Sequence, residues 1–349
     1  MKYKEIEEKQ NIVSDLFYEY SVGAKPFLKW VGGKRQLLSQ FENLYPTELK
    51  QRKIKNYYEP FVGGGAVFFD VAQNYEVENA YLYDINDELI LCYKVIQKDV
   101  HKLLEFLYKY DKIYKSLSEK KQQEYYYELR DSYNLNRFNI DYEKYSENWI
   151  PRVAQTLFLN KTCFNGLFRF NSKGGFNSPQ GKYKNPNIID EQNLLNVSKL
   201  LEIATIKKAD FREVKNDVKD NSFLYFDPPY RPISETASFT AYSKFNFEDD
   251  EQLQLASLYI ELDQLGHKLM LSNSDPKNTN PEDNFFDTIY SNYTISRVDA
   301  KRSINSDEVN YKNLGVTTRV GLSVPIFFCS KKTSKKRISS SIPNAKLSA

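Results

Sequence analysis

The sequence predicts an α/β fold, in which helices pack on a mostly parallel sheet and a helical, loop-rich segment interrupts the sheet domain. Three observations support this prediction. Residues 57–72 and 79–97 each have the pattern of a strand, a turn and a helix. The same alternation returns in residues 223–275. Between these parts, residues 99–150 are rich in Lys, Glu and Tyr at helical spacing, which is typical of a helical insertion.

The elements follow this plan in order along the chain. A glycine pair at 32–33 precedes a helical pattern with apolar residues at 37, 38, 41 and 44. Later, Phe223–Phe226 predicts a short buried strand, and residues 250–266 predict an amphipathic helix. The predicted divisions are a charged leader (1–24), a sheet domain (25–98 and 200–330), an insert (99–199) and a basic, Ser-rich tail (331–349) whose composition favours disorder.

Composition excludes several protein classes. Of the 349 residues, 41% are hydrophobic and 27% are charged, which suits a soluble folded chain. No apolar run approaches the ~20 residues of a membrane span, and the charged start lacks a signal-peptide core, so we expect a cytoplasmic protein. The scattered cysteines and scarce histidines predict no disulfide framework and no metal site: Cys92, Cys163, Cys329, His101 and His267.

Charge is unevenly distributed. No Asp or Glu occurs from Asn148 to Ile189, whereas this window holds six basic residues: Arg152, Lys161, Arg169, Lys173, Lys182 and Lys184. A long acid-free, aromatic-rich segment is typical of a surface that faces a polyanion. The alternative is a chance gap in the acids of a lysine-rich protein.

Three predicted strands end on acids, and the first is followed by a glycine turn. Glu59, Asp84 and Asp227 stand at these ends, and Gly63–Gly65 follows Glu59. In open parallel sheets, ligands bind beyond the carboxyl ends of the strands. Glycines allow close backbone approach, and Asp84 lies about twenty residues on, where an acid binds ribose hydroxyls in dinucleotide-binding units. The pattern predicts a nucleoside site; the alternative is an ordinary tight turn.

Two phosphate-binding motifs do not fit. Phe68 stands where a dinucleotide fingerprint needs its third glycine. Around Lys34, Leu28 replaces the first glycine of a P-loop and Arg35 replaces its Ser or Thr. A nucleoside cofactor without bound phosphates suits the sequence better.

The stretch Asp227–Tyr230, with the sequence DPPY, ends a buried strand on a carboxylate followed by two prolines. The amine of a nucleobase is a poor nucleophile because its lone pair is delocalised into the ring. The Asp227 carboxylate and the Pro228 carbonyl, each accepting one amine hydrogen, favour the reactive pyramidal nitrogen. The prolines stiffen the turn, and Tyr230 offers a ring on which a base can stack. The alternative is a simple helix cap and turn.

Several motifs occur in a recognisable order: PFLKWVGGK (26–34), EPFVGGGAVFF (59–69), YDIND (83–87), ADF (209–211) and DPPY (227–230), with further matches at 165–186 and 234–247. Over about residues 25–310 the chain resembles the adenine-specific DNA methyltransferases of the Dam type, in the alpha motif order. It is most similar to GATC-modifying enzymes of restriction–modification systems. The resemblance implies a Rossmann-like sheet that binds S-adenosylmethionine and an inserted, mostly helical DNA-recognition domain.

The resemblance also implies roles for single residues. Trp30 packs against the cofactor, Asp84 binds its ribose, and Asp210 with Phe211 holds its adenine. The full implied cofactor set is Trp30, Lys34, Glu59, Phe61, Gly63, Gly65, Asp84, Asp210, Phe211 and Asp227. Asp227, Pro228 and Tyr230 are the implied catalytic residues, which hold the flipped adenine.

For DNA, the resemblance implies contacts by Lys29, Phe164, Asn165, Leu167, Arg169, Pro179, Tyr183, Arg302 and Asn305. Phe164 matches an aromatic wedge that enters the helix where the base leaves. Arg169 suits a bidentate contact with guanine, although it could bind phosphate alone. Alternatively, Trp30 and Phe164 are aromatic residues that only pack in the hydrophobic core.

We therefore predict a monomeric enzyme that methylates adenine N6 within GATC in double-stranded DNA, alongside an endonuclease for the same site. A cytosine C5 enzyme is disfavoured because no cysteine follows a proline. A cytosine N4 enzyme stays an alternative, although these more often carry Ser at position 227. A catalytically silent DNA-binding relative is the other alternative, against which the intact DPPY and glycine turn argue.

The sequence departs from the family pattern after Asp307, where a basic loop and a glutamate-bearing strand are expected. The run Leu322–Phe328 predicts the last strand, and Pro325 within it favours an edge position.

Overall fold

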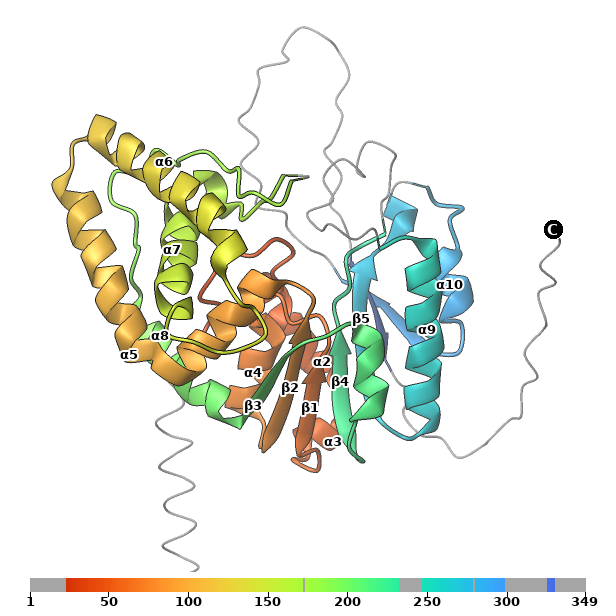
Figure 1. Cartoon of the computed structure of the whole chain (residues 1–349). Helices are drawn as coiled ribbons and strands as arrows, with labels where there is room; N and C mark the ends of the chain where they lie inside the picture. Colours follow the sequence, from red (N-terminus) through yellow and green to blue (C-terminus); the bar gives the residue numbers. More distant parts are fainter. Residues whose placement is uncertain (1–22, 172, 232–246, 279, 299–324, 330–349) are drawn as a thin grey trace, which may run out of the picture.

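The structure is a computed structural model that describes residues 23–171, 173–231, 247–278, 280–298 and 325–329. The described residues form one seven-stranded sheet in the order β3-β2-β1-β4-β5-β7-β6 (Figure 1). Its strands are β1 Asn56–Glu59, β2 Asn79–Asp84, β3 Ala204–Lys208, β4 Ser222–Phe226, β5 Lys268–Ser274, β6 Thr294–Arg297 and β7 Pro325–Cys329. Every pairing is parallel except those of β7, which runs antiparallel to β5 and β6. The predicted mixed α/β fold is confirmed.

The helices cover both faces of the sheet and build the insert (Figure 1). Their bounds are α2 Leu38–Leu44, α3 Thr47–Lys50, α4 Ala66–Asn74, α5 Asp87–Ser116, α6 Glu119–Asn136, α7 Trp149–Thr162, α8 Glu191–Leu200, α9 Asp249–Gln264 and α10 Phe285–Ile289. Among the described helices, none has both the length and the apolar character needed to cross a bilayer.

Side chains alternate between the two faces of the sheet, as the pleat requires. Tyr57 of β1 and Phe223 of β4 belong to the core cluster under α2, α4, α5 and α8. Their neighbours Tyr58 and Leu224 belong to the cluster under α9 and α10. Because β4 is buried on both sides, it reads as a continuous apolar run rather than an alternating one.

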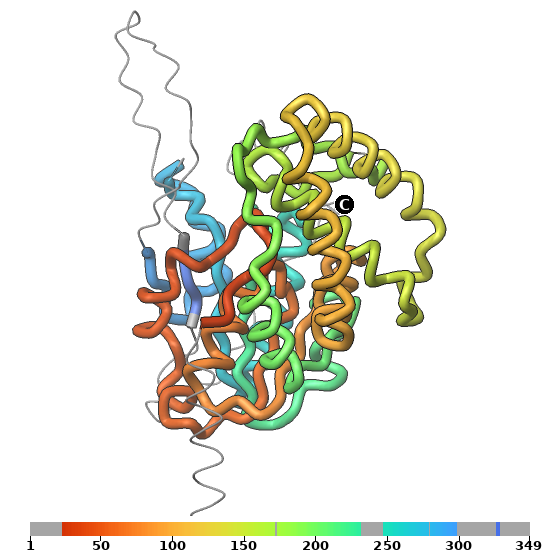
Figure 2. The backbone as a smooth tube through the Cα atoms, turned by 90° about the vertical axis from the view of Figure 1, so that its left-hand side faces the viewer, coloured from red at the N-terminus to blue at the C-terminus, as the bar shows by residue number. Residues whose placement is uncertain are grey.

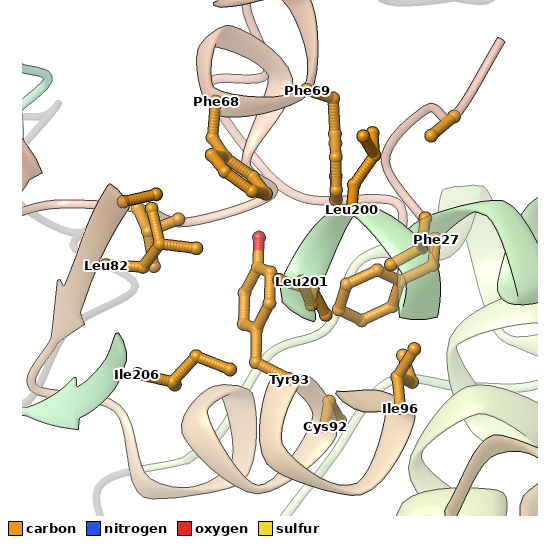
Figure 3. Close-up of a cluster of buried hydrophobic side chains, with 14 of the residues drawn as sticks. Phe27, Phe68, Phe69, Leu82, Cys92, Tyr93, Ile96, Leu200, Leu201 and Ile206 are labelled. Carbon is orange, nitrogen blue, oxygen red and sulfur yellow. The ribbon is translucent and has the colours of Figure 1, made fainter. Parts of the chain in front are cut away.

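The first core cluster reaches the glycine turn through Tyr93 of α5 (Figure 3). The Tyr93 ring meets Phe27 edge to face, with centroids 5.0 Å apart. Its hydroxyl, at the edge of the apolar cluster, donates a hydrogen bond to the Gly63 carbonyl at 3.0 Å. The turn that follows β1 is thereby fixed to the core.

The insert has an aromatic cluster of its own. Tyr126 and Tyr133 of α6 pack there with Phe158 of α7 and with Phe168 and Phe176 of the loop that follows. In Figures 1 and 2, α6 and α7 extend beyond the sheet domain. α5 runs into the insert and has a non-helical residue, Asp99 (φ −137°, ψ 40°), where the predicted boundary lies. The division into domains stays a prediction.

Two predictions need correction. Pro325 does not mark an edge, because β7 pairs with β5 on one side and β6 on the other. Proline is tolerated there because it is the first residue of the strand, opposite Ser274. Arg152 does not face a polyanion, because it is buried and its guanidinium binds the Glu88 carboxylate. Four other basic residues of the window are exposed as expected: Arg169, Lys173, Lys182 and Lys184.

Some predictions lie outside the described residues. These are most of the leader (1–22), the tail (331–349), nearly all of the match at 234–247, and the DNA contacts Arg302 and Asn305.

Candidate functional site

The site lies where the strand order reverses, between β1 and β4. β2 and β3 lie on one side of β1, and β5 lies on the far side of β4. In open parallel sheets, ligands bind at such a point, outside the carboxyl ends of the two strands. Glu59 ends β1 and Asp227 directly follows β4, so both predicted acids stand at this edge of the sheet.

The Asp227 carboxylate is held on both oxygens. Oδ2 accepts a hydrogen bond from Lys34 Nζ at 2.5 Å, and Oδ1 accepts one from the Ser272 hydroxyl at 2.8 Å. Ser272 is also bonded to the Tyr225 hydroxyl at 2.9 Å. The Asp227 side chain keeps 19% of its surface exposed. The carboxylate is therefore fixed in direction yet open to a ligand.

Lys34 joins the first motif to the DPPY turn. Its buried ammonium donates to the Gly32 carbonyl at 2.7 Å and lies 4.9 Å from the centre of the Tyr230 ring. Burial lowers the pKa of Lys34, but the charge of Asp227, the nearby Tyr230 and the hydrogen bonds to both together outweigh burial, so the pKa is raised above its usual value. The ammonium stays charged beside Asp227.

A buried polar network holds the turn after Pro228. The Pro229 carbonyl accepts from Gln252 Nε2 at 3.2 Å, and Gln252 Oε1 accepts from Asn273 Nδ2 at 3.1 Å. Arg231 closes the turn by ion pairs to Asp249 and Asp283. Among the described residues, none donates a hydrogen bond to the Pro228 carbonyl.

Sequence reasoning missed the residues that support this turn, which are Gln252, Ser272 and Asn273. A signal was present, because Ser272 to Ser274 are consecutive polar residues in the strand β5, and all three are buried. Buried polar groups need hydrogen-bond partners, so such a run indicates a network.

The glycine turn has the backbone geometry that its residues predict. Gly63 (φ +47°) and Gly65 (φ +69°) are in the left-handed region, which other residues rarely adopt. A Cβ on Gly63 would lie 3.1 Å from the Trp30 indole. The Gly63 amide donates to Asp84 Oδ2 at 3.1 Å. The glycine turn, Trp30 and Asp84 therefore pack against one another, and this cluster is here called the Trp30 wall.

Asp84 is the acid of this wall. Its Oδ1 accepts from the Asn86 amide at 2.9 Å. Burial raises the pKa of Asp84 to about 6, although the amides of Asn86 and Gly63 act in the opposite direction. The carboxyl group therefore titrates close to neutral pH.

The remaining predicted cofactor residues stand at or just after the carboxyl ends of β1 and β3. Glu59 is buried and accepts from the Tyr57 hydroxyl at 2.7 Å; its burial raises the pKa of Glu59 well above the usual value. Phe61 stacks on Phe211 with centroids 5.3 Å apart. Asp210 caps the short helix that begins at Phe211 and is bound by Arg212.

The chemistry of these residues suits a nucleoside. The partly buried Asp84 carboxylate suits ribose hydroxyls, the stacked Phe61 and Phe211 suit a base, and the glycine turn admits close backbone approach. In the described part of the chain, no three His, Cys, Asp or Glu side chains are grouped as metal ligands.

Most of the predicted DNA residues lie on the loop of residues 163–171 and 173–183, here called the reading loop after the role that the sequence predicts for it. Phe164 is 52% exposed, so it is not a core aromatic, and its amide donates to the Pro179 carbonyl at 2.8 Å. Exposed Arg169 donates from Nε to Asn177 Oδ1 at 3.0 Å. Lys29 Nζ lies 5.2 Å from the centre of the Tyr183 ring.

The reading loop thus carries six of the predicted contacts, and one of them, Tyr183, lies beside Lys29. Asn165 (φ +54°) follows Phe164 and is exposed. The Leu167 amide donates to the Phe164 carbonyl at 3.2 Å. The arrangement presents an aromatic ring, an amide and a guanidinium on one exposed loop.

Comparisons with known proteins show the family of this chain. The family model of the D12 class N6 adenine-specific DNA methyltransferases matches residues 30–304. A type II methyltransferase, M.MjaIII of Methanocaldococcus jannaschii, is 52% identical over 281 residues, which cover 80% of this chain and 93% of the relative.

Two further relatives are less similar. The type II methyltransferase M1.LlaDCHI of Lactococcus lactis subsp. cremoris is 35% identical over 291 residues, covering 83% of this chain and 92% of the relative. A DNA adenine methylase of Vibrio cholerae is 31% identical over 286 residues, covering 80% of this chain and 92% of the relative.

Proposed function

Because the chain belongs to the D12 class of N6 adenine-specific DNA methyltransferases, we propose that it transfers the methyl group of S-adenosylmethionine to adenine N6 within GATC. The observation that carries this proposal is the Asp227 carboxylate, which Ser272 and Lys34 hold directly after β4 and which Pro228 follows in the chain. We further propose that the enzyme acts as a monomer in the cytoplasm. There it protects DNA from an endonuclease that cuts the same site without a stable complex between the two.

In the proposed cofactor site, the residues of the Trp30 wall bind S-adenosylmethionine. S-adenosylmethionine supplies a methyl group on a positively charged sulfur. Asp84 accepts hydrogen bonds from the ribose, Phe61 and Phe211 hold the adenine, and Glu59, Gly63 and Gly65 line the methionine part. Trp30 closes the wall against the glycines.

The proposed target site grips an exocyclic amine. Asp227 and the Pro228 carbonyl each accept one amine hydrogen, and this directs the nitrogen lone pair away from the ring. Ser272 and Lys34 keep their bonds to Oδ1 and Oδ2, because a carboxylate oxygen accepts more than one hydrogen bond, and a remaining lone pair of Asp227 accepts the amine hydrogen. The Tyr230 ring supports the base, and the stiff turn keeps the two acceptors in place before the base arrives.

Base flipping follows from the position of the target atom. The adenine amine is inside the duplex stack, so the base must leave the helix to reach Asp227. The exposed Phe164 ring is suited to filling the space that the base vacates, and Arg169 is suited to reading an adjacent guanine.

The test is the modification pattern of plasmid DNA from a methylation-deficient host that expresses the protein. We expect N6-methyladenine at every GATC when modified bases are mapped by long-read sequencing. Adenine-sensitive GATC endonucleases should fail to cut this DNA, whereas cytosine-sensitive ones should cut it. Modified cytosine, or no modified base, would contradict the proposed reaction; methyladenine at another sequence would contradict only the proposed target.

The pKa of Asp84 predicts how cofactor affinity changes with pH. With a pKa of about 6, Asp84 is protonated in acid and then accepts ribose hydrogen bonds poorly. Affinity for S-adenosylhomocysteine should therefore be high at pH 7.5 and fall below pH 6, by roughly tenfold per pH unit at most. Calorimetric titration from pH 5 to 8 measures this, and Asp84→Asn should bind weakly with a flat profile. An unmutated protein with a flat profile would contradict the assignment.

A further inference from the structure

Asn160 is a fully buried amide (0% exposed) near the end of α7. Its Oδ1 accepts from the Lys29 amide at 2.9 Å, and its Nδ2 donates to the Lys29 carbonyl at 2.9 Å. The same Nδ2 also donates to the Gly166 carbonyl at 3.3 Å. One side chain therefore joins α7, the segment before Trp30 and the reading loop.

Gly166 brings the reading loop against Lys29. Its φ of +66° is in the left-handed region, and a Cβ at this position would overlap the Lys29 side chain. Gly166 lies between Asn165 and Leu167, two of the proposed base-reading residues. A shift of Asn165 or Leu167 on binding DNA would therefore also move Gly166 against the Lys29 side chain.

Lys29 is next in sequence to Trp30, which lies on the other side against the glycine turn. Cβ atoms on Gly63 and Gly64 would be 3.1 and 3.2 Å from Trp30. The Gly63 amide in turn is bonded to Asp84. Direct contacts or covalent links therefore form a continuous series: Gly166, Asn160, Lys29, Trp30, Gly63 and Asp84.

We propose that Asn160 is a positioning residue that couples the reading of target bases to the binding of the cofactor. This inference rests on the proposed function. Asn160 acts through its two backbone partners, because it holds Lys29 and Gly166 in one relative position. Target DNA that orders the reading loop therefore orders the Trp30 wall as well. Such coupling is reciprocal, so the cofactor raises affinity for target DNA by the same factor.

Asn193 of α8 provides a matched control. Its Oδ1 accepts from the Lys25 amide at 2.9 Å, and its Nδ2 donates to the Lys25 carbonyl at 3.0 Å. Asn193 is also buried, and it makes the same pair of backbone hydrogen bonds as Asn160, but to Lys25, four residues before Lys29. The described residues show no bond from Asn193 to the reading loop. It differs from Asn160 in lacking the link to Gly166.

The experiment compares Asn160→Ala, Asn193→Ala and the unmutated full chain. Calorimetry gives the dissociation constant of S-adenosylhomocysteine with and without saturating GATC duplex, and the ratio of the two is the coupling factor. We expect a factor of at least roughly fivefold for the unmutated protein and for Asn193→Ala. For Asn160→Ala it should fall to about one. Thermal melting should show similar stability losses in both variants.

Three results would overturn the inference. In the first, Asn160→Ala keeps the coupling factor. In the second, Asn193→Ala loses it to the same extent, which would make both residues merely structural. In the third, the unmutated protein methylates adenine in duplex DNA but shows no coupling. The third result leaves the proposed function intact, whereas failure of that function would appear separately as an absence of methyl transfer.

Discussion

Replacing Asp227 with alanine is expected to reduce the rate of methyl transfer by roughly 10³-fold or more, while binding of DNA changes little. The carboxylate is fixed by Ser272 and Lys34 before any ligand arrives, so its contribution is made to the reacting amine. Single-turnover transfer of a tritiated methyl group to a GATC duplex measures the rate. Fluorescence anisotropy of a labelled duplex measures binding.

Two companion variants sharpen this test. Ser272→Ala keeps the carboxylate but frees Oδ1, so we expect a smaller loss, on the order of tenfold. Asp250→Ala, on the exposed first turn of α9, should leave the rate unchanged. If Asp227→Ala transferred methyl groups as fast as Asp250→Ala, the proposed site would be wrong.

Replacing Glu88 with glutamine is expected to lower the free energy of unfolding by about 3–5 kcal/mol, the largest stability change that we predict. Arg152 is buried, donates to Glu88 from Nε at 3.1 Å and from Nη2 at 2.5 Å, and stacks on the Tyr133 ring. Tyr142 donates a further bond to Glu88 at 2.6 Å. Without the carboxylate, a guanidinium charge is left in the interior. Thermal melting should show a midpoint lower by roughly 5–10 °C.

A double-mutant cycle isolates the ion pair. Arg152→Met should destabilise as Glu88→Gln does, but the double variant should lose less than the sum, because neither charge is then left alone. The exposed pair of Lys121 and Glu124 on α6 is the control, and Glu124→Gln should not shift the midpoint. Strict additivity in the cycle would show that the two groups do not interact.

The strand ends were predictable because they depend on short-range patterns. An apolar run closed by Asp227 and two prolines has few structural solutions. Glycines followed by a helical pattern and, about twenty residues on, by Asp84 indicate a turn against a strand end. Glu59 and Asp84 end the neighbouring strands β1 and β2, and Asp227 follows β4, since parallel strands share the edge at which they end.

Side-chain direction was not predictable to the same extent. Arg152 sits in an acid-free window, yet its partner Glu88 is 64 residues earlier on another helix. Pro325 was assigned to an edge because sequence does not show that β6 adds outside β7. Asn160 and Ser272 gave only weak signals, since a polar residue in a buried element does not reveal its partner.

By itself, the sequence determined the α/β class, the family and the chemical identity of the residues at the strand ends, because these depend on periodicity and on contiguous motifs. The tertiary structure alone decided that Lys34 and Ser272 fix the two oxygens of Asp227, and that Asn160 joins the reading loop to the Trp30 wall. The physical reason is that these bonds join residues between 6 and 193 positions apart, and folding rather than chain order sets which polar groups satisfy one another.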